Sequence, residues 1–260
     1  MPVEIKYYIL LFFTASFLGW LMEVVSKLVQ FHRFINRGFL LGPICPIYGF
    51  GSVLITVLLS RYAERPLAVF CLGMIVCGTL EYVTSFVLEK LFHARWWDYS
   101  QKRFNLNGRV CADTLIPFGL LGLVMIYCIK PFLFRYFAEL PLGWLNGLCI
   151  GLSAVFAADT VLSTCVLGQI RHHATNAAGD STEAITAAVR AHLAEGGILM
   201  RRTLRAFPYA KLYNRKLLDR IKAQRQAMRK EMKVQQEKIR QDIKLREDKL
   251  REELRQKRKH

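Results

Sequence analysis

The sequence predicts an all-α, polytopic membrane helix bundle of about five transmembrane helices, followed by a cytoplasmic, basic helical tail that resembles a coiled coil. Three observations predict it. The 260 residues are 53% hydrophobic yet carry a net charge of +17, a combination that is untypical of a soluble domain. The charge is concentrated in residues 211–260, which hold 19 Lys and Arg against 8 Asp and Glu. The rest contains stretches near the 20 or so apolar residues that a membrane helix needs.

Five stretches qualify as spans: 5–28, 44–60, 67–88, 110–129 and 142–167. The second is the shortest and begins with Pro-containing sequence. The first lacks a basic leading region and a small-residue cleavage site, so we interpret it as a span and not as a signal peptide. These stretches define a transmembrane domain over residues 1–167.

The orientation follows from Lys and Arg near the span ends. With five spans, the loops 30–43 and 91–109 lie on the same side as the tail, and that side carries most of the positive charge. We therefore expect a multi-pass protein of the cell membrane, with its N-terminus outside and its C-terminal tail in the cytoplasm.

Residues 168–210 are predicted to form a cytoplasmic helical hinge. Asp180 and Glu183 have the spacing of a helix cap and its reciprocal partner, ahead of an apolar periodic run. Gly196 and Gly197 are expected to end that helix.

Residues 211–260 are predicted to form a basic helical stalk. Its large apolar residues alternate in steps of four and seven, which makes an 11-residue repeat and one narrow apolar seam: Leu217, Ile221, Met228, Met232, Ile239, Ile243, Leu250 and Leu254. A seam of this size favours pairing through 217–254, with a second copy or with a partner. The basic faces also suit anionic membrane lipid. No specific nucleic acid is expected, because no aromatic residue follows Tyr213.

Two connections in the membrane part are too irregular or too polar to be simple loops. Residues 34–51 hold four Gly and two Pro, so they cannot form one regular helix. Residues 91–111 carry five basic side chains besides two adjacent Trp. Irregular backbone at membrane depth must be held by protein or line a polar cavity. The alternative is a re-entrant turn with interfacial aromatic anchors, which is favoured for Trp96, Trp97 and Tyr99 taken alone.

Four acids fall within or next to the predicted spans: Glu23, Glu81, Asp113 and Asp159. Ionisable groups at membrane depth are costly and usually face the bundle interior or a water path. Each acid either lines a substrate path or pairs with a base or hydroxyl to fix helix packing. Pairing is favoured for Glu23 and Asp113, which can reach Arg33, Arg37 or Arg109. Glu81 and Asp159 have no base in register, so we expect them to be protonated or to line a transport path.

Several of these segments resemble a known family. The segments are GWLMEV at 19–24, INRGFLLGPICPIYGFG at 35–51, LEYVTSFVLEKLFHARWWDYS at 80–100 and FNLNGRVC at 104–111. They resemble the CmpB-like family of ABC-transporter permeases, also described as ABC-transporter type IV. The resemblance covers roughly residues 7–130 and leaves the fifth span and the stalk outside. It implies a permease subunit that works with a separate ATPase.

The motif loops supply further candidate site residues, all expected at the cytoplasmic face: Asn36, Arg37, Gly38, Gly42, Pro43, Pro46, Tyr48, Gly49, Glu89, His93, Arg95, Trp97, Asp98, Tyr99, Asn105, Gly108 and Arg109. We expect the two loops to fold against each other. Arg37, Arg95 and Arg109 would supply positive charge. The counter-charges would be Asp98, Glu89 and Glu23. Lys102 is expected to be solvated.

Two other classes of function stay open. One is a non-catalytic membrane scaffold whose tail recruits partners or lipid. The other is a membrane-interface enzyme that acts on lipid through His93, Asp98 and Arg109. The sequence contains no G-x-x-x-x-G-K-[ST], H-E-x-x-H or G-x-S-x-G motif, which makes a catalytic role less favoured. Its seven cysteines include no C-x-x-C pair. No cofactor, metal site or catalytic residue is predicted.

Overall fold

The computed structural model describes residues 2–32, 34, 36, 38, 40–92, 94–176, 211–212 and seven positions between 220 and 235. The chain divides into two units, Met1–Tyr213 and Asn214–His260. The first unit holds the membrane helices and the candidate site.

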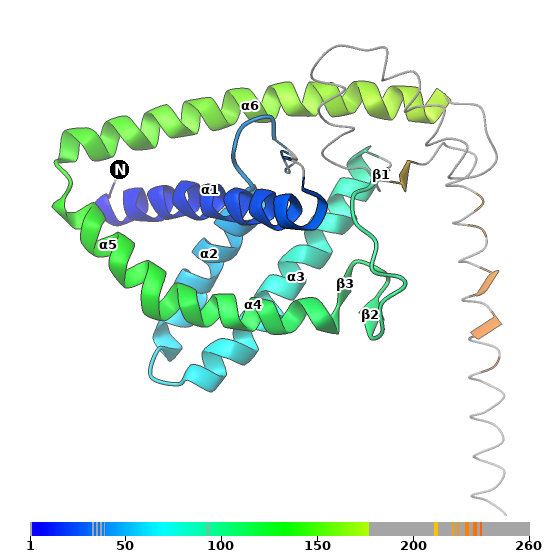
Figure 1. The fold of residues 1–260 in the computed structure, drawn as a ribbon, viewed down its shortest axis with the longest axis horizontal. Coiled ribbons are helices and arrows are strands. Elements are labelled where there is room, and N and C mark those ends of the chain that lie inside the picture. Colours follow the sequence, from blue (N-terminus) through cyan, green and yellow to red (C-terminus); the bar gives the residue numbers. More distant parts are fainter. Residues whose placement is uncertain are drawn as a thin grey trace, which may run out of the picture. The chain divides into compact units, whose positions relative to one another are not determined.

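Within its described residues, the first unit contains six α-helices, which Figure 1 shows. They are α1 (Val3–Phe31), α2 (Pro46–Leu59), α3 (Pro66–Phe92), α4 (Ala112–Val124), α5 (Lys130–Glu139) and α6 (Leu142–Asn176). A short 3-10 turn, Ser60–Tyr62, follows α2, and a π-helical segment, Met125–Ile129, joins α4 to α5. The all-α class is confirmed.

Four short strands accompany the helices: β1 (Ala94–Arg95), β2 (Asn105–Leu106), β3 (Val110–Cys111) and β4 (Lys211–Leu212). β2 and β3 form an antiparallel hairpin in which Leu106 pairs with Val110. β1 pairs with β4, so residues 211–212, which we expected to begin the helical stalk, form a strand.

Four helical segments within the described residues are long and apolar enough to cross a membrane. They are Val3–Gln30, Pro66–Phe92, Ala112–Glu139 and Leu142–Gln169. They correspond to the first, third, fourth and fifth predicted spans. The fourth predicted span continues from α4 through the π-helical segment and α5 to Glu139. α6 continues to Asn176, beyond the predicted end at 167.

The second predicted span, 44–60, is not among these segments, because its helix, α2, is too short to cross a membrane alone. α2 has 14 residues, which gives a length of about 21 Å, against about 30 Å of hydrocarbon. The backbone N–H of Cys45, just before α2, donates to the carbonyl of Ser16 at 3.0 Å. α2 therefore begins beside the middle of α1, and the backbone that precedes it is non-helical.

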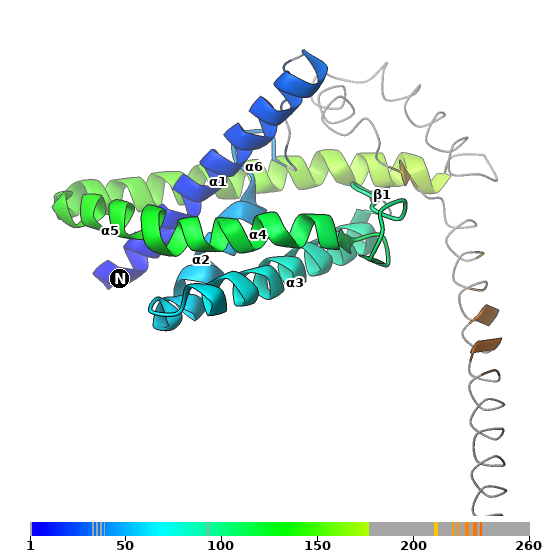
Figure 2. The same ribbon diagram turned by 60° about the horizontal axis from the view of Figure 1, so that its bottom comes forward.

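The core lies where α1, α2, α3 and the π-helical segment meet. Its buried residues are Leu11, Ala15, Ile55, Leu59, Val69, Met125 and Ile126. α3 and α4 are antiparallel and lie side by side (Figure 2). Their backbones approach closely at Gly73 and Gly122, where a Cβ on Gly73 would lie 3.6 Å from the Cα of Gly122.

Gly49 permits a similar approach between α1 and α2. A Cβ at this position would lie 2.6 Å from the backbone oxygen of Phe12 and would overlap the hydroxyl of Ser16. Gly49→Ala is therefore expected to destabilise the bundle by about 1–3 kcal/mol, as overpacking does. The measurement is the midpoint of thermal unfolding in detergent.

Gly143→Ala is the matched control, because a Cβ on Gly143 would meet nothing within 4 Å. It should leave the midpoint unchanged or raise it slightly, since Ala favours helix. Equal midpoints for the two variants would contradict the described contact between α1 and α2.

The predicted hinge and stalk fall mostly outside the described residues. In the second unit the described positions are helical, and the two seam residues among them, Met228 and Met232, are exposed. Pairing through the seam stays a prediction.

Candidate functional site

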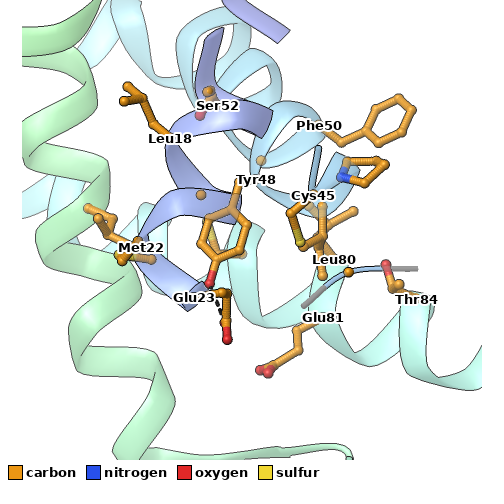
Figure 3. A pocket seen from close by; sticks show the side chains of 18 of the residues that line it. Leu18, Met22, Glu23, Cys45, Tyr48, Phe50, Ser52, Leu80, Glu81 and Thr84 are labelled. Carbon is orange, nitrogen blue, oxygen red and sulfur yellow. Dashed lines mark hydrogen bonds between the residues drawn. The ribbon is translucent and has the colours of Figure 1, made fainter. Parts of the chain in front are cut away.

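A cavity of about 960 Å³ lies among α1, α2, α3 and α4, with residues of both motif loops in its wall. Figure 3 shows Cys45, Tyr48 and Phe50 of the first loop beside Glu23 and Glu81. Its volume is at the upper end of the range for small-molecule sites. The lining is mainly apolar and aromatic, and includes Leu18, Met22, Phe50, Leu80, Trp97 and Phe118. Two carboxylates, Glu23 and Glu81, interrupt this apolar wall.

Glu23 enters the cavity from α1 and is bound by Tyr48 of α2. The Tyr48 ring lies against Gly19, one helical turn before Glu23 on the same face. This packing brings the Tyr48 hydroxyl to Glu23, where it donates to Oε1 at 2.8 Å (Figure 3). The expected pairing of Glu23 with Arg33 or Arg37 cannot be followed, because both arginines lie outside the described residues.

Glu81 enters from α3, and its residue is only 7% exposed. The Tyr99 hydroxyl donates to its Oε1 at 3.2 Å. The Thr114 hydroxyl lies 3.4 Å from Oε2, and its nearer acceptor is the Cys111 carbonyl at 2.8 Å. Burial, followed by the negative charges of Glu81 and more weakly Glu23, raises the pKa of Tyr99 above its ordinary value. Tyr99 therefore remains a neutral donor and lies within the electrostatic reach of both acids.

Neither Glu23 nor Glu81 forms an ion pair with a Lys or Arg among the described residues. Lys27 also lines the cavity, but its Nζ donates to Gln30 at 2.6 Å. The two acids are thus held by hydroxyl groups, and neither has a basic partner in this part of the chain.

The polar connection between α3 and α4 is organised by an ion-pair cluster. Glu89 Oε2 accepts from Arg109 at 2.8 Å and from Arg95 at 3.1 Å, and Arg95 also pairs with Asp98 at 3.2 Å. Arg109 is buried, donates to Ser85 at 3.3 Å and lies over the rings of Tyr82 and Phe86. Two arginines and two acids thus neutralise one another beneath the hairpin.

Backbone geometry completes this connection. Gly108 has φ +66°, and a Cβ there would lie 2.7 Å from the Asp98 carboxylate. Its N–H donates to Asn105 at 2.9 Å and its carbonyl accepts from the Tyr99 N–H at 2.8 Å. The Trp97 indole donates to the Arg109 carbonyl at 3.1 Å. The connection therefore holds the Tyr99 hydroxyl against Glu81.

Asp159 of α6 binds the non-helical segment before α2. Its two carboxylate oxygens accept the backbone N–H groups of Leu41 at 2.9 Å and Gly42 at 2.8 Å. A Cβ on Gly42 would lie 2.9 Å from the same carboxylate. Ser163 donates to Asp159 at 3.0 Å. In α1, the Trp20 indole donates to Asn36 at 2.7 Å. The irregular backbone is therefore held by protein, as it must be at membrane depth.

Asp113 is the one predicted buried acid that the structure places elsewhere. Its side chain is 65% exposed and pairs with Lys102 at 3.3 Å, while Arg109 pairs with Glu89. Asp113 lies in the first turn of α4 and points away from the bundle, so pairing with Arg109 is wrong. Lys102, expected to be solvated, is 59% exposed.

The other predicted residues divide between the cavity and the loop backbone. Gly38 is buried with φ +135°, Pro46 is the first residue of α2, and Pro43 is exposed. Gly38 and Pro46 line the cavity together with Trp97 and Tyr99, so both motif loops contribute to one wall. Arg37 and His93 lie outside the described residues.

Sequence reasoning missed four hydroxyl groups at these sites: Ser85, Thr114, Ser163 and the cavity-lining Ser52. Two of them had a readable signal. Ser163 lies four residues after Asp159, and Ser85 lies four before Glu89, so each shares a helical face with its acid. Thr114 and Ser52 depend on contacts between helices and carry no such local signal. Within the part of the chain that the structure describes, no group of three His, Cys, Asp or Glu could hold a metal.

Comparison with known proteins gives one match. The model of the family described as "Putative ABC-transporter type IV" matches residues 10–164. The match extends into α6, so the expected limit of the resemblance near residue 130 is wrong. No curated protein and no solved structure matches the chain.

Proposed function

Because the chain belongs to the ABC-transporter type IV family, we propose that it is the membrane-spanning permease subunit of an ABC-type transporter, working with a separate ATPase. The observation that carries this proposal is the cavity at membrane depth, with Glu23 and Glu81 in its wall. Acids inside a membrane bundle mark substrate or ion paths more often than they mark simple packing.

The non-helical segment before α2 supports the same proposal. Membrane transporters commonly form their substrate sites where a helix is interrupted and its backbone faces a cavity. Here α2 begins beside the middle of α1, and Gly38, Leu40 and Cys45 of the preceding segment line the cavity. A short helix with irregular backbone thus occupies the place of a second full-length span.

A separate ATPase is required because the sequence contains no phosphate-binding loop. The β2–β3 hairpin offers a surface for it. Phe104, just before β2, is 88% exposed, Leu106 in β2 is exposed, and Lys102 and Arg103 immediately precede them. The positive-inside rule places this connection in the cytoplasm, where an ATPase would dock. The same proposal places the tail in the cytoplasm and the N-terminus outside. It also includes the pairing of two copies through residues 217–254.

The alternative of a lipid-acting enzyme has less support. Asp98 and Arg109, two of its three expected residues, are engaged in ion pairs with Arg95 and Glu89. His93 lies outside the described residues. The scaffold alternative rests on the exposed seam residues Met228 and Met232, and the same purification experiment tests it.

The test is purification of the tagged full-length chain from its native host in mild detergent, followed by measurement of ATP hydrolysis in the eluate. We expect a co-purifying protein that hydrolyses ATP. Phe104→Asp should reduce the co-purified hydrolysis at least tenfold, because it places a charge in the proposed apolar contact.

Tyr136→Asp is the matched control, since Tyr136 is also an exposed aromatic residue but lies in α5, away from the hairpin. It should retain the hydrolysis. An eluate of well-folded wild-type chain without ATP hydrolysis would overturn the permease assignment. Self-association without hydrolysis would favour the scaffold.

A further inference from the structure

We propose that the cavity binds a monovalent organic cation with an apolar body, and that the carboxylates of Glu81 and Glu23 hold its charged group. Such a cation would be the substrate of the proposed permease, and that link rests on the permease proposal. Binding itself requires only the cavity.

The charge of the site favours a cation. Glu81 is 7% exposed and, among the described residues, receives a hydrogen bond from the Tyr99 hydroxyl but from no base. A carboxylate offers about four acceptor positions, so positions remain open on both Glu81 and Glu23. Among the described residues that line the cavity, Lys27 is the only base against these two acids.

A charge at membrane depth needs a partner of opposite sign. A monovalent organic cation would supply the basic partner that the two acids lack, whereas an anion would meet both carboxyl groups. A neutral solute would leave both acids without a basic partner. The two acids come from different helices, α1 and α3, and both carboxyl groups extend into the cavity (Figure 3).

The rest of the wall favours an apolar body. Phe50, Trp97 and Phe118 line the cavity, and aromatic faces attract cations as well as apolar groups. The volume of about 960 Å³ accommodates a drug-sized molecule and exceeds what a bare metal ion needs.

A separate observation indicates that polar contacts in the cavity are left for a ligand. The Ser52 residue is only 8% exposed and lines the cavity, yet its hydroxyl has no hydrogen bond to any described residue. Ser52 lies on α2, one turn after Tyr48, and can therefore accept from or donate to a ligand that reaches Glu23.

The experiment measures binding of radiolabelled tetraphenylphosphonium to the purified full-length chain in detergent. Saturable binding is expected. Unlabelled benzyltrimethylammonium should displace the probe, whereas benzyl alcohol and benzylsulfonate, its neutral and anionic counterparts, should not displace it at the same concentration. Glu81→Gln and Glu23→Gln should each weaken binding at least tenfold, because the amide keeps the size of the side chain and removes its charge.

Asp113→Asn is the control, because this acid is exposed and lies outside the cavity lining. It should bind the probe as the wild type does. The thermal unfolding midpoint of each variant shows whether it is folded. If a Gln variant does not fold, the displacement of the probe by the three competitors on the wild-type chain tests the cation proposal instead. Absence of saturable binding, equal displacement by benzyl alcohol, or wild-type affinity in a folded Glu81→Gln variant would overturn the cation proposal.

This assay needs no ATPase, so the two proposals fail separately. Loss of cation binding with a retained ATP-hydrolysing partner would overturn only the ligand class. Cation binding by a chain that brings no ATP-hydrolysing partner would overturn only the permease assignment.

Discussion

Arg109→Ala is expected to be among the most damaging single substitutions in the chain. The Arg109 side chain is 5% exposed and donates to Glu89 at 2.8 Å and to Ser85 at 3.3 Å. Its removal would leave Glu89 partly uncompensated in a poorly hydrated place. Breaking a buried pair in this way costs about 3–5 kcal/mol. We expect low yield of folded protein and a clearly lowered unfolding midpoint.

Lys102→Ala is the matched control. Lys102 also belongs to the α3–α4 connection and also has an acidic partner, Asp113 at 3.3 Å, but its side chain is 59% exposed. Exposed ion pairs contribute about 0–1 kcal/mol, so yield and midpoint should stay near the wild-type values. If the two variants behave alike, the connection is an ordinary interfacial loop whose charges only follow the positive-inside rule.

Asp159→Ala is expected to have an effect of similar size through a different mechanism. The substitution removes the carboxylate that accepts the backbone N–H groups of Leu41 and Gly42. The Leu41 N–H keeps the Ser163 hydroxyl at 3.1 Å, whereas the Gly42 N–H loses its acceptor among the described residues. A buried donor without a partner costs about 1–3 kcal/mol. The segment before α2 should therefore detach from α6.

Two measurements check this prediction. The unfolding midpoint should fall, and the alkylation rate of Cys45, followed by mass spectrometry, should rise because Cys45 lies in the same segment. Asp113→Ala removes an exposed acid and should change neither quantity. An unchanged Cys45 rate in a folded Asp159→Ala variant would show that the carboxylate does not hold this segment.

The helical class and four of the membrane helices could be predicted, because length and apolar content alone identify a membrane span. The second span could not. Its apolar residues continue to 60, but Pro46 starts the helix late, and the Gly-rich residues before it are bound by Ser16 and Asp159. Sequence reasoning indicated irregular backbone in this region. It could not show that a non-helical segment and a short helix stand where one full-length helix was expected.

The acids of the cavity could be predicted from the sequence, whereas their hydrogen-bond partners could not. Glu23 and Glu81 stand out because charge at membrane depth is costly. Tyr48 and Tyr99 reach them from 25 and 18 residues away, and only the packing of helices brings them together. The predicted pairing of Asp113 with Arg109 is wrong because closeness to the end of a span does not determine which way a side chain in the first turn of α4 points.

The two proposals together imply that a separate ATPase drives a cationic solute through the cavity of this chain. ATP hydrolysis by the co-purified complex in lipid nanodiscs, measured with and without tetraphenylphosphonium, tests both at once. We expect the cation to stimulate hydrolysis severalfold in the wild-type complex and to have no effect in the Glu81→Gln complex. Hydrolysis that is indifferent to the cation in both complexes, or equally stimulated in both, would contradict this expectation.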